Sequence, residues 1–218
     1  MPSKKLILSM LLAAATVISS SFAIDFTRLQ DEFKKKFGQQ SLPTFMAWQN
    51  FMNTSTELQA DDKIKRSNEL INRIVTWQED QKIWGQQDYW ATPLETLSKK
   101  MGDCEDFAII KYFSLKNLNV PISQLRLVYV KAKNGSGGEQ AHMVLAYYPT
   151  PDSEPLILDN MLNDIRPASR RPDLTPVFSF NSEGIYNGAA GKDQQSGGIE
   201  RLSKWQDLLQ RAQAEGFN

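Results

Sequence analysis

The stretch that decides the fold is residues 102–115, which read GDCEDFAIIKYFSL. Asp103 is a residue type that begins helices, and Asp106 follows it three positions later, as at the start of a capped helix. The side chains of Phe107–Leu115 are apolar on nearly every side of such a helix, which is typical of a helix buried at the centre of a protein. The sequence therefore predicts a central helix that carries Cys104 at its N-terminus.

Downstream of this helix the apolar residues follow the period of a β-strand. Alternation predicts strands at Leu125–Lys131 and Ala141–Tyr148, joined by the glycine-rich loop 134–138. Leu156–Asp159 predicts a third strand and Val177–Tyr186 a fourth. We therefore expect an antiparallel sheet against which the buried helix packs.

Helices are expected in the remaining parts of the chain. Residues 25–80 have apolar spacings of three and four, which predict two or three helices with breaks at 41–43 and 53–55. Thr92-Pro93-Leu94-Glu95 is a capping-box sequence that starts a short helix ending near Lys100. A loop rich in Gly, Ser and Gln at 187–198 precedes a closing helix at about 199–214. The fold class is α+β.

The first 23 residues have the pattern of a cleavable signal peptide. Lys4 and Lys5 precede an apolar run at Leu6–Val17, and Ser21 and Ala23 take the −3 and −1 positions of a cut. The run is shorter than the roughly 20 apolar residues that span a bilayer. We therefore expect an exported, soluble protein that does not span the membrane; a retained N-terminal anchor is the alternative.

The charge balance of the mature chain bears on the kind of partner it binds. Removing residues 1–23 takes away two lysines and no acid, which leaves 23 basic and 25 acidic side chains and a net charge of −2. Such a balance gives no sign of nucleic-acid binding. Residues 24–218 have the length of one domain, with a helical N-terminal part at 24–80 and a catalytic core at 81–218.

The chain has one cysteine and one histidine. Exported proteins usually pair their cysteines, so the lone Cys104 is buried and inert, used between chains, or a reactive thiol. A helix N-terminus and a nearby imidazole both favour a thiolate. His142 begins the second predicted strand and Asp159 ends the third, so Asp159 can face one ring nitrogen while the other faces the thiol. A small buried cysteine and a passive histidine are the alternative.

Four separated motifs carry a family resemblance. They are WGQQDYWATP at 84–93, GDCEDFA at 102–108, EQAHMVL at 139–145 and LDN at 158–160. In this order they resemble the bacterial transglutaminase-like cysteine proteinases of the LapG type. The resemblance implies a papain/transglutaminase-like core with a triad of Cys104, His142 and Asp159.

The same resemblance implies a biological role. LapG-type proteases are periplasmic endopeptidases that control biofilm attachment by cutting a large surface adhesin near its N-terminus, at a di-alanine site. An inner-membrane cyclic di-GMP receptor of the LapD type restrains them. This chain has its own di-alanine step in Gly188-Ala189-Ala190-Gly191, which is either a plain connector or a weak substrate mimic.

Other functions remain open from the residues alone. A cell-wall amidase of the NlpC/P60 type or an acyl-transferring transglutaminase would use the same nucleophile, although Glu-Asp after Cys104 differs from the serine-rich helix start of NlpC/P60 enzymes. A non-catalytic periplasmic adaptor would not need the thiol.

Carboxylates surround the cysteine in sequence. Asp103, Glu105 and Asp106 would raise the thiol pKa unless their charge is offset, and oxygen ligands are those that calcium prefers. The resemblance also implies a calcium-dependent enzyme with Asp103 and Glu105 as ligands. The alternative is that these residues only cap the helix and complement its dipole.

Overall fold

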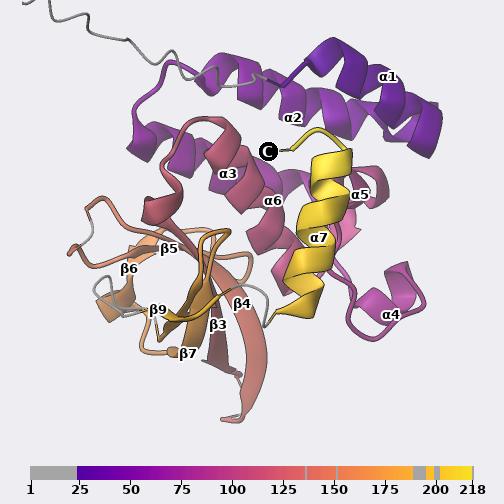
Figure 1. Ribbon diagram of the computed structural model, residues 1–218. Helices are drawn as coiled ribbons and strands as arrows, with labels where there is room; N and C mark the ends of the chain where they lie inside the picture. Colours follow the sequence, from indigo (N-terminus) through magenta and orange to yellow (C-terminus); the bar gives the residue numbers. More distant parts are fainter. Residues whose placement is uncertain (1–23, 136, 151, 189–194, 199–201, 218) are drawn as a thin grey trace, which may run out of the picture.

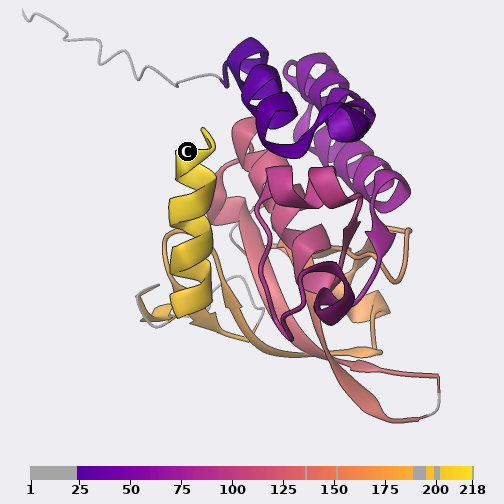
Figure 2. The same cartoon turned by 90° about the vertical axis from the view of Figure 1, so that its right-hand side faces the viewer.

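The computed structural model describes residues 24–135, 137–150, 152–188, 195–198 and 202–217. Helices gather on one side of an antiparallel sheet, so the structure has a helical layer and a sheet layer (Figures 1 and 2). The predicted α+β class is confirmed. The predicted signal peptide, residues 1–23, and the Ala189–Ala190 step lie outside the described residues.

Helix α6 (Cys104–Asn117) is the predicted central helix. It packs against strands β3 (Leu125–Lys133) and β4 (Glu139–Tyr147) and against helix α3 (Ala60–Ile74). All its residues from Asp106 to Leu115 are buried. Each large apolar side chain buried in this way stabilises the fold by roughly 1.5–3 kcal/mol, so α6 anchors the core.

The sheet brings the strand ends that matter for the site together. Among the described residues it has seven strands in the order β6-β5-β4-β3-β7-β8-β9. The bounds of the other five are β5 Leu156–Leu158, β6 Arg166–Pro167, β7 Leu174–Phe180, β8 Ile185–Asn187 and β9 Gln195–Gly197. Leu145 pairs with Leu158 in the antiparallel β4–β5 ladder, so the next residue, Asp159, lies at the level of Val144, two residues from His142 along β4.

The prediction of one strand at Val177–Tyr186 is wrong. β7 ends at Phe180 and β8 begins at Ile185, because the Asn181 side chain folds the chain into a turn. Asn181 Oδ1 accepts the N–H groups of Glu183 at 2.8 Å and Gly184 at 3.2 Å. The predicted loop at 187–198 also contains a short strand, β9, which pairs with β8.

The N-terminal part is helical, as predicted. It contains α1 (Phe26–Phe37), a 3-10 turn at Gln39–Ser41, α2 (Leu42–Ser55) and α3. The break expected at 41–43 falls slightly earlier, between Phe37 and Leu42, and Pro43 lies in the first turn of α2. The break expected at 53–55 falls later, since α2 continues to Ser55 and α3 begins only at Ala60.

Several short elements lead into the central helix. These are β1 Thr76–Trp77, α4 Asp80–Ile83, α5 Pro93–Lys99 and β2 Met101–Gly102; 3-10 turns at Ile122–Gln124 and Ala168–Arg170 follow later in the chain. The capping box at the start of α5 is confirmed: Thr92 accepts from the Glu95 N–H, and the Glu95 carboxylate accepts from the Thr92 N–H. β1 and β2 pair in parallel, which fixes the backbone just before Cys104.

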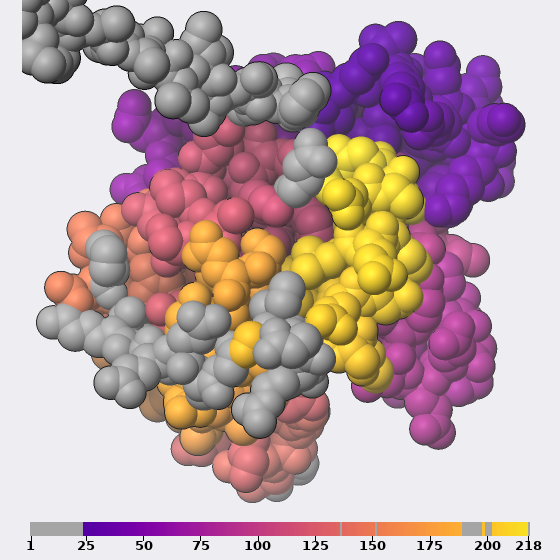
Figure 3. Space-filling model, viewed as in Figure 1, coloured from indigo at the N-terminus to yellow at the C-terminus, as the bar shows by residue number. Residues whose placement is uncertain are grey.

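Helix α7 (Ser203–Ala214) closes the structure. It forms a surface ridge between the N-terminal helices and the sheet (Figure 3). Trp205 on α7 is fully buried, and its indole N–H donates to the Asn181 carbonyl at 3.1 Å. The last helix therefore ties the β7–β8 turn to the core.

Candidate active site

The predicted site residues Cys104 and His142 line one cavity of about 1000 Å³. Cys104 enters it from the N-terminus of α6 and His142 from β4. Trp77 and Met161 lie at the same cavity, and both side chains are about half exposed. The structure thus brings the only thiol and the only imidazole of the sequence to one solvent-accessible space.

The His142 imidazole is held by a buried carboxylate. Its Nε2 lies 2.8 Å from Asp159 Oδ1, and both side chains are buried. Asp159 Oδ1 also accepts the Met161 N–H at 2.9 Å, and Oδ2 accepts from Arg171 at 2.7 Å. Although burial opposes ionisation, the His142 and Arg171 hydrogen bonds and the Met161 N–H lower the pKa of Asp159 to about 2.

Asp159 is therefore a carboxylate at neutral pH, and a carboxylate only accepts hydrogen bonds. The Nε2 atom of His142 must then carry a proton, and Nδ1 is the ring nitrogen that is left to accept one. Asp159 itself does not line the cavity; it lies behind the imidazole.

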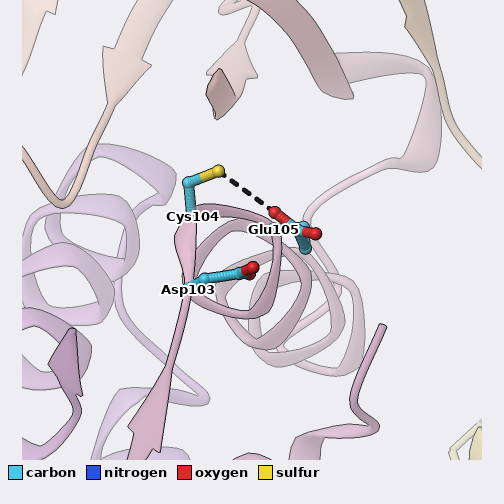
Figure 4. Close-up of side chains that lie close together, drawn as sticks. All are labelled: Asp103, Cys104 and Glu105. Atoms are coloured by element: carbon cyan, nitrogen blue, oxygen red, sulfur yellow. Dashed lines mark hydrogen bonds between the residues drawn. The ribbon is translucent and has the colours of Figure 1, made fainter. Parts of the chain in front are cut away.

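The Cys104 thiol is engaged by its own neighbour. Its Sγ lies 3.1 Å from Glu105 Oε2, while the Asp103 carboxylate lies across the start of the helix (Figure 4). Burial, followed by the charge of Glu105 and the hydrogen bond to it, raises the pKa of the thiol well above its usual range. Among the described residues, the side chain that bonds the thiol is thus Glu105 and not His142, while a hydrogen bond from the Met143 N–H acts against the rise in the thiol pKa.

Asp103 occupies the N-cap position of α6, but its side chain makes no capping hydrogen bond. The alternative that the Asp103 side chain simply caps the helix is therefore wrong. Asp106, considered as the capping partner, is fully buried, accepts the Ala91 N–H at 2.9 Å and takes a backbone hydrogen bond from Asp103, as an N3 capping partner does. Both carboxylates are also part of a larger acidic cluster.

This acidic cluster consists of Asp80, Asp88, Asp103, Glu105 and Asp106. One oxygen from each of Asp80, Asp103 and Asp106 lies within 4.8 Å of the others, and the same holds for Asp80, Asp88 and Glu105. Sequence reasoning missed Asp80 and Asp88 as members. They lie 23 and 15 positions before Asp103, and only the path through α4 brings them close.

The cluster is electrostatically unfavourable by itself. Burial, followed by the charge of Glu105, raises the pKa of Asp103 to about 10, and burial chiefly raises the pKa of Asp80 to about 6. One buried oxygen of each of Asp80, Asp103 and Asp106 has no hydrogen-bond partner among the described residues. Unpaired, close carboxylate oxygens are the donor set of a hard divalent cation, so these residues fit a calcium ion.

The aromatic segment before α5 shapes the same region. Trp90 lines the cavity and packs on Phe180 and Trp205, so it serves both as core and as cavity wall. Tyr89 donates its hydroxyl to Glu95 at 3.0 Å, which joins this segment to the capping box of α5.

The sequence of residues 43–172 matches the family model described as bacterial transglutaminase-like cysteine proteinase. This match covers more than half of the chain. The chain belongs to the bacterial transglutaminase-like cysteine proteinases. No curated protein gives a significant match.

Solved structures agree with this membership. Legionella pneumophila LapG is 38% identical, with a TM-score of 0.73 and coverage of 87% of this chain and 98% of that one. LapG of the same organism in its calcium-bound form is 38% identical, with a TM-score of 0.74 and coverage of 86% and 99%. An EGTA-treated form is 37% identical with a TM-score of 0.74, covering 87% and 98%.

This cysteine proteinase therefore shares its fold and most of its length with LapG. Over the residues that the structure describes, each helix is too short or too polar to cross a bilayer.

Proposed function

We propose that this cysteine proteinase is a calcium-dependent endopeptidase in which Cys104 is the nucleophile, His142 the base and Asp159 the orienting carboxylate. The observation that carries the proposal is the buried His142–Asp159 pair, whose imidazole lines the same cavity as a thiol at a helix N-terminus. A nucleophile, a base and a group that orients the base are the parts that acyl transfer requires.

The proposed chemistry assigns each proton. His142 Nδ1 takes the thiol proton as the Cys104 sulfur bonds to the scissile carbonyl carbon, and the Cys104 backbone N–H is one donor to the oxyanion. The imidazolium, stabilised by ionised Asp159, then gives that proton to the departing amine. A water molecule, deprotonated by the same nitrogen, releases the acyl group and restores the thiol.

Calcium would supply the positive charge that the acidic cluster lacks. We propose that Asp103 and Glu105 are ligands, with Asp80 and Asp88 as further carboxylates within reach. With Glu105 as a ligand, the thiol would lose the hydrogen bond and the nearby charge that raise its pKa. The thiol would then be free to turn to His142. The calcium-bound form of LapG supports this proposal.

The proposals for the substrate and the regulation rest on the similarity to LapG. We propose that the chain is exported to the periplasm by residues 1–23, cuts a large surface adhesin near its N-terminus at a di-alanine site, and so controls biofilm attachment. We further propose restraint by a LapD-type cyclic di-GMP receptor, which would cover the cavity. Trp77 and Met161, exposed at that cavity, are suitable apolar anchors for such a partner.

The deciding experiment measures hydrolysis of a di-alanine-containing adhesin fragment by the mature chain with calcium. We expect Cys104→Ala and His142→Ala to lower kcat by several orders of magnitude with the fold intact, because nucleophile and base act as a unit. Asp159→Asn should also be severe, since an amide can hold the wrong imidazole tautomer. Near-normal turnover by His142→Ala would refute the triad, because the sequence has no second histidine.

Chelation tests the calcium proposal separately. EGTA should abolish hydrolysis and added calcium restore it, and Asp103→Ala or Glu105→Ala should be inactive while retaining Cys104. Hydrolysis that persists in EGTA and in both variants would refute it. Calorimetry with the periplasmic domain of a LapD-type receptor tests the partner, and unchanged affinity in Trp77→Ala would exclude this surface.

A further inference from the structure

The second carboxylate oxygen of Asp159 has no role in the proposed triad. Asp159 Oδ1 is occupied by His142 Nε2 at 2.8 Å and the Met161 N–H at 2.9 Å. Oδ2 accepts from Arg171 Nη2 at 2.7 Å. We propose that Arg171 is a positioning residue that fixes the rotation of the Asp159 carboxylate and so the tautomer and orientation of His142. This inference rests on the proposed triad.

Arg171 is itself fixed in place, so it can immobilise the Asp159 carboxylate. Only 5% of the residue is exposed. Its Nη2 also donates to Asp173 Oδ2 at 2.8 Å, and its Nε donates to Asp173 Oδ1 at 3.0 Å. A planar guanidinium held in this way on one carboxylate presents its remaining donor direction to a second one. Asp173, Arg171, Asp159 and His142 thus form one chain of alternating charge that ends at the imidazole.

The backbone contacts around Asp159 do not fix its carboxylate, so a side chain such as Arg171 is needed to hold it. Strand β5 has three residues, and Asp159 follows it directly. Asn72 of α3 donates to the Asp159 carbonyl at 2.8 Å and to Asn163 Oδ1 at 2.9 Å, which fixes the main chain but not the carboxylate. Without Arg171, Oδ2 would lose its hydrogen-bond partner, and the carboxylate could rotate away from the ring.

Other charged groups near Asp159 do not replace Arg171. Lys111 of α6 is fully buried, and its Nζ donates to Asn68 Oδ1 at 2.7 Å and not to Asp159. The Lys111 amine therefore bonds helix α3 and leaves the Asp159 carboxylate to Arg171. Arg171 is the cation that donates directly to the carboxylate of the pair.

The experiment measures kcat, KM and the thermal midpoint of the calcium-loaded mature chain with Arg171→Ala. We expect kcat to fall about 100-fold, with KM and the circular dichroism spectrum nearly unchanged. Guanidinium ion at tens of millimolar, far below denaturing concentrations, should restore part of kcat by occupying the vacated space. Methylammonium at the same ionic strength should not, because it lacks the planar fork.

A purely structural role for Arg171 gives a different result. It would lower the thermal midpoint and kcat together, and guanidinium would not restore kcat at a constant midpoint; that result would overturn the proposal. Arg171→Met keeps the buried volume and removes both charge and donors, so it replaces Arg171→Ala if the alanine variant does not fold. Wild-type kcat in a folded Arg171→Met protein would equally overturn it.

Two controls separate this inference from the proposed function. Arg166→Ala removes an arginine whose side chain is 45% exposed and pairs with Asp164, and it should leave kcat unchanged. Asp159→Asn tests the triad itself. Full activity of Asp159→Asn would reject the triad, whereas loss in Asp159→Asn with full activity in Arg171→Met would reject only the role of Arg171.

Discussion

At the scale of single residues, Lys111 is the least expected feature of the central helix. It is fully buried, and its Nζ donates to Asn68 at 2.7 Å. Burial, only partly offset by the charge of Asp159, lowers its pKa to about 7. A lysine is close to 10.4 in an unfolded chain, so folding releases a proton from this residue at pH values between the two.

This linkage predicts how stability changes with pH. Between about pH 7 and pH 10 the unfolded state binds the Lys111 proton and the folded state does not, so the free energy of unfolding rises with pH. The contribution is full above the unfolded pKa and is lost as pH falls through about 7. Lys111→Met should reduce the slope between pH 7.5 and 9 by about 1.4 kcal/mol per pH unit.

Urea denaturation at several pH values measures this slope. Lys65→Met, at an exposed position on α3, is the control and should retain the wild-type slope. If the unfolding free energy changed with pH at the same slope in wild type and Lys111→Met, the buried lysine would stay protonated in the folded state.

The residues of the candidate site differ in how far the sequence could predict them. Cys104 and His142 are the sole cysteine and histidine of the chain, so composition alone made them candidates. Asp103 and Glu105 became candidates because they flank the cysteine in sequence. Arg171 lies among other arginines in a segment with no apolar pattern. Its role depends on a contact with Asp159, 12 positions earlier, and no local signal encodes that contact.

At the scale of elements, α5 sets the path by which the chain enters the nucleophile helix. The buried Thr92 hydroxyl accepts the Glu95 N–H at 3.2 Å, and the Glu95 carboxylate accepts the Thr92 N–H at 2.9 Å. The same carboxylate pairs with Arg211 of α7 at 2.7 Å. The cap of α5 is therefore shared with the closing helix.

Loss of this cap should destabilise the fold by about 1–2 kcal/mol, the upper range for N-cap residues. The change is Thr92→Ala, compared with Thr92→Ser, which loses the same methyl group but keeps the hydroxyl. Chemical denaturation gives the difference between the two variants. Equal unfolding free energies would show that the hydroxyl contributes nothing to α5.

Elements with a strong local pattern were predictable, and elements defined by distant pairing were not. α5, α6, β3 and β4 carry capping residues or an unbroken apolar period, and the structure contains them near the expected bounds. β1 and β2 have two residues each, and Thr76 pairs with Met101, 25 positions later. A two-residue strand has no period to detect.

At the scale of the whole molecule, the acidic cluster joins segments that are far apart in the chain. Asp80 begins α4 and accepts the Tyr89 N–H at 2.5 Å, while Asp103 precedes α6. Asp88 forms an ion pair with Lys204 of α7. A cation bound by the cluster would thus stabilise the folded state and not the unfolded chain, where these carboxylates are dispersed.

This arrangement predicts opposite effects of one substitution with and without calcium. Asp80→Asn removes a charge from the cluster but keeps an oxygen that can accept the Tyr89 N–H. In EGTA we expect its thermal midpoint to equal or exceed that of wild type, because carboxylate repulsion is reduced. In calcium the thermal midpoint of the wild type should rise more than that of the variant, because the variant has lost a candidate carboxylate ligand. An ion present at 100 times its Kd stabilises the folded state by about 2.7 kcal/mol.

Differential scanning calorimetry in EGTA and in calcium measures how far calcium raises the thermal midpoint of the wild type and of Asp80→Asn. Asp164→Asn is the control. Asp164 has a 73% exposed side chain paired with Arg166, so its substitution should leave the calcium increment unchanged. If Asp80→Asn instead gained as much from calcium as wild type, Asp80 would lie outside the ion's ligand set. If it were also less stable in EGTA, its carboxylate would be needed for the Tyr89 hydrogen bond, and charge repulsion within the cluster would be the smaller effect.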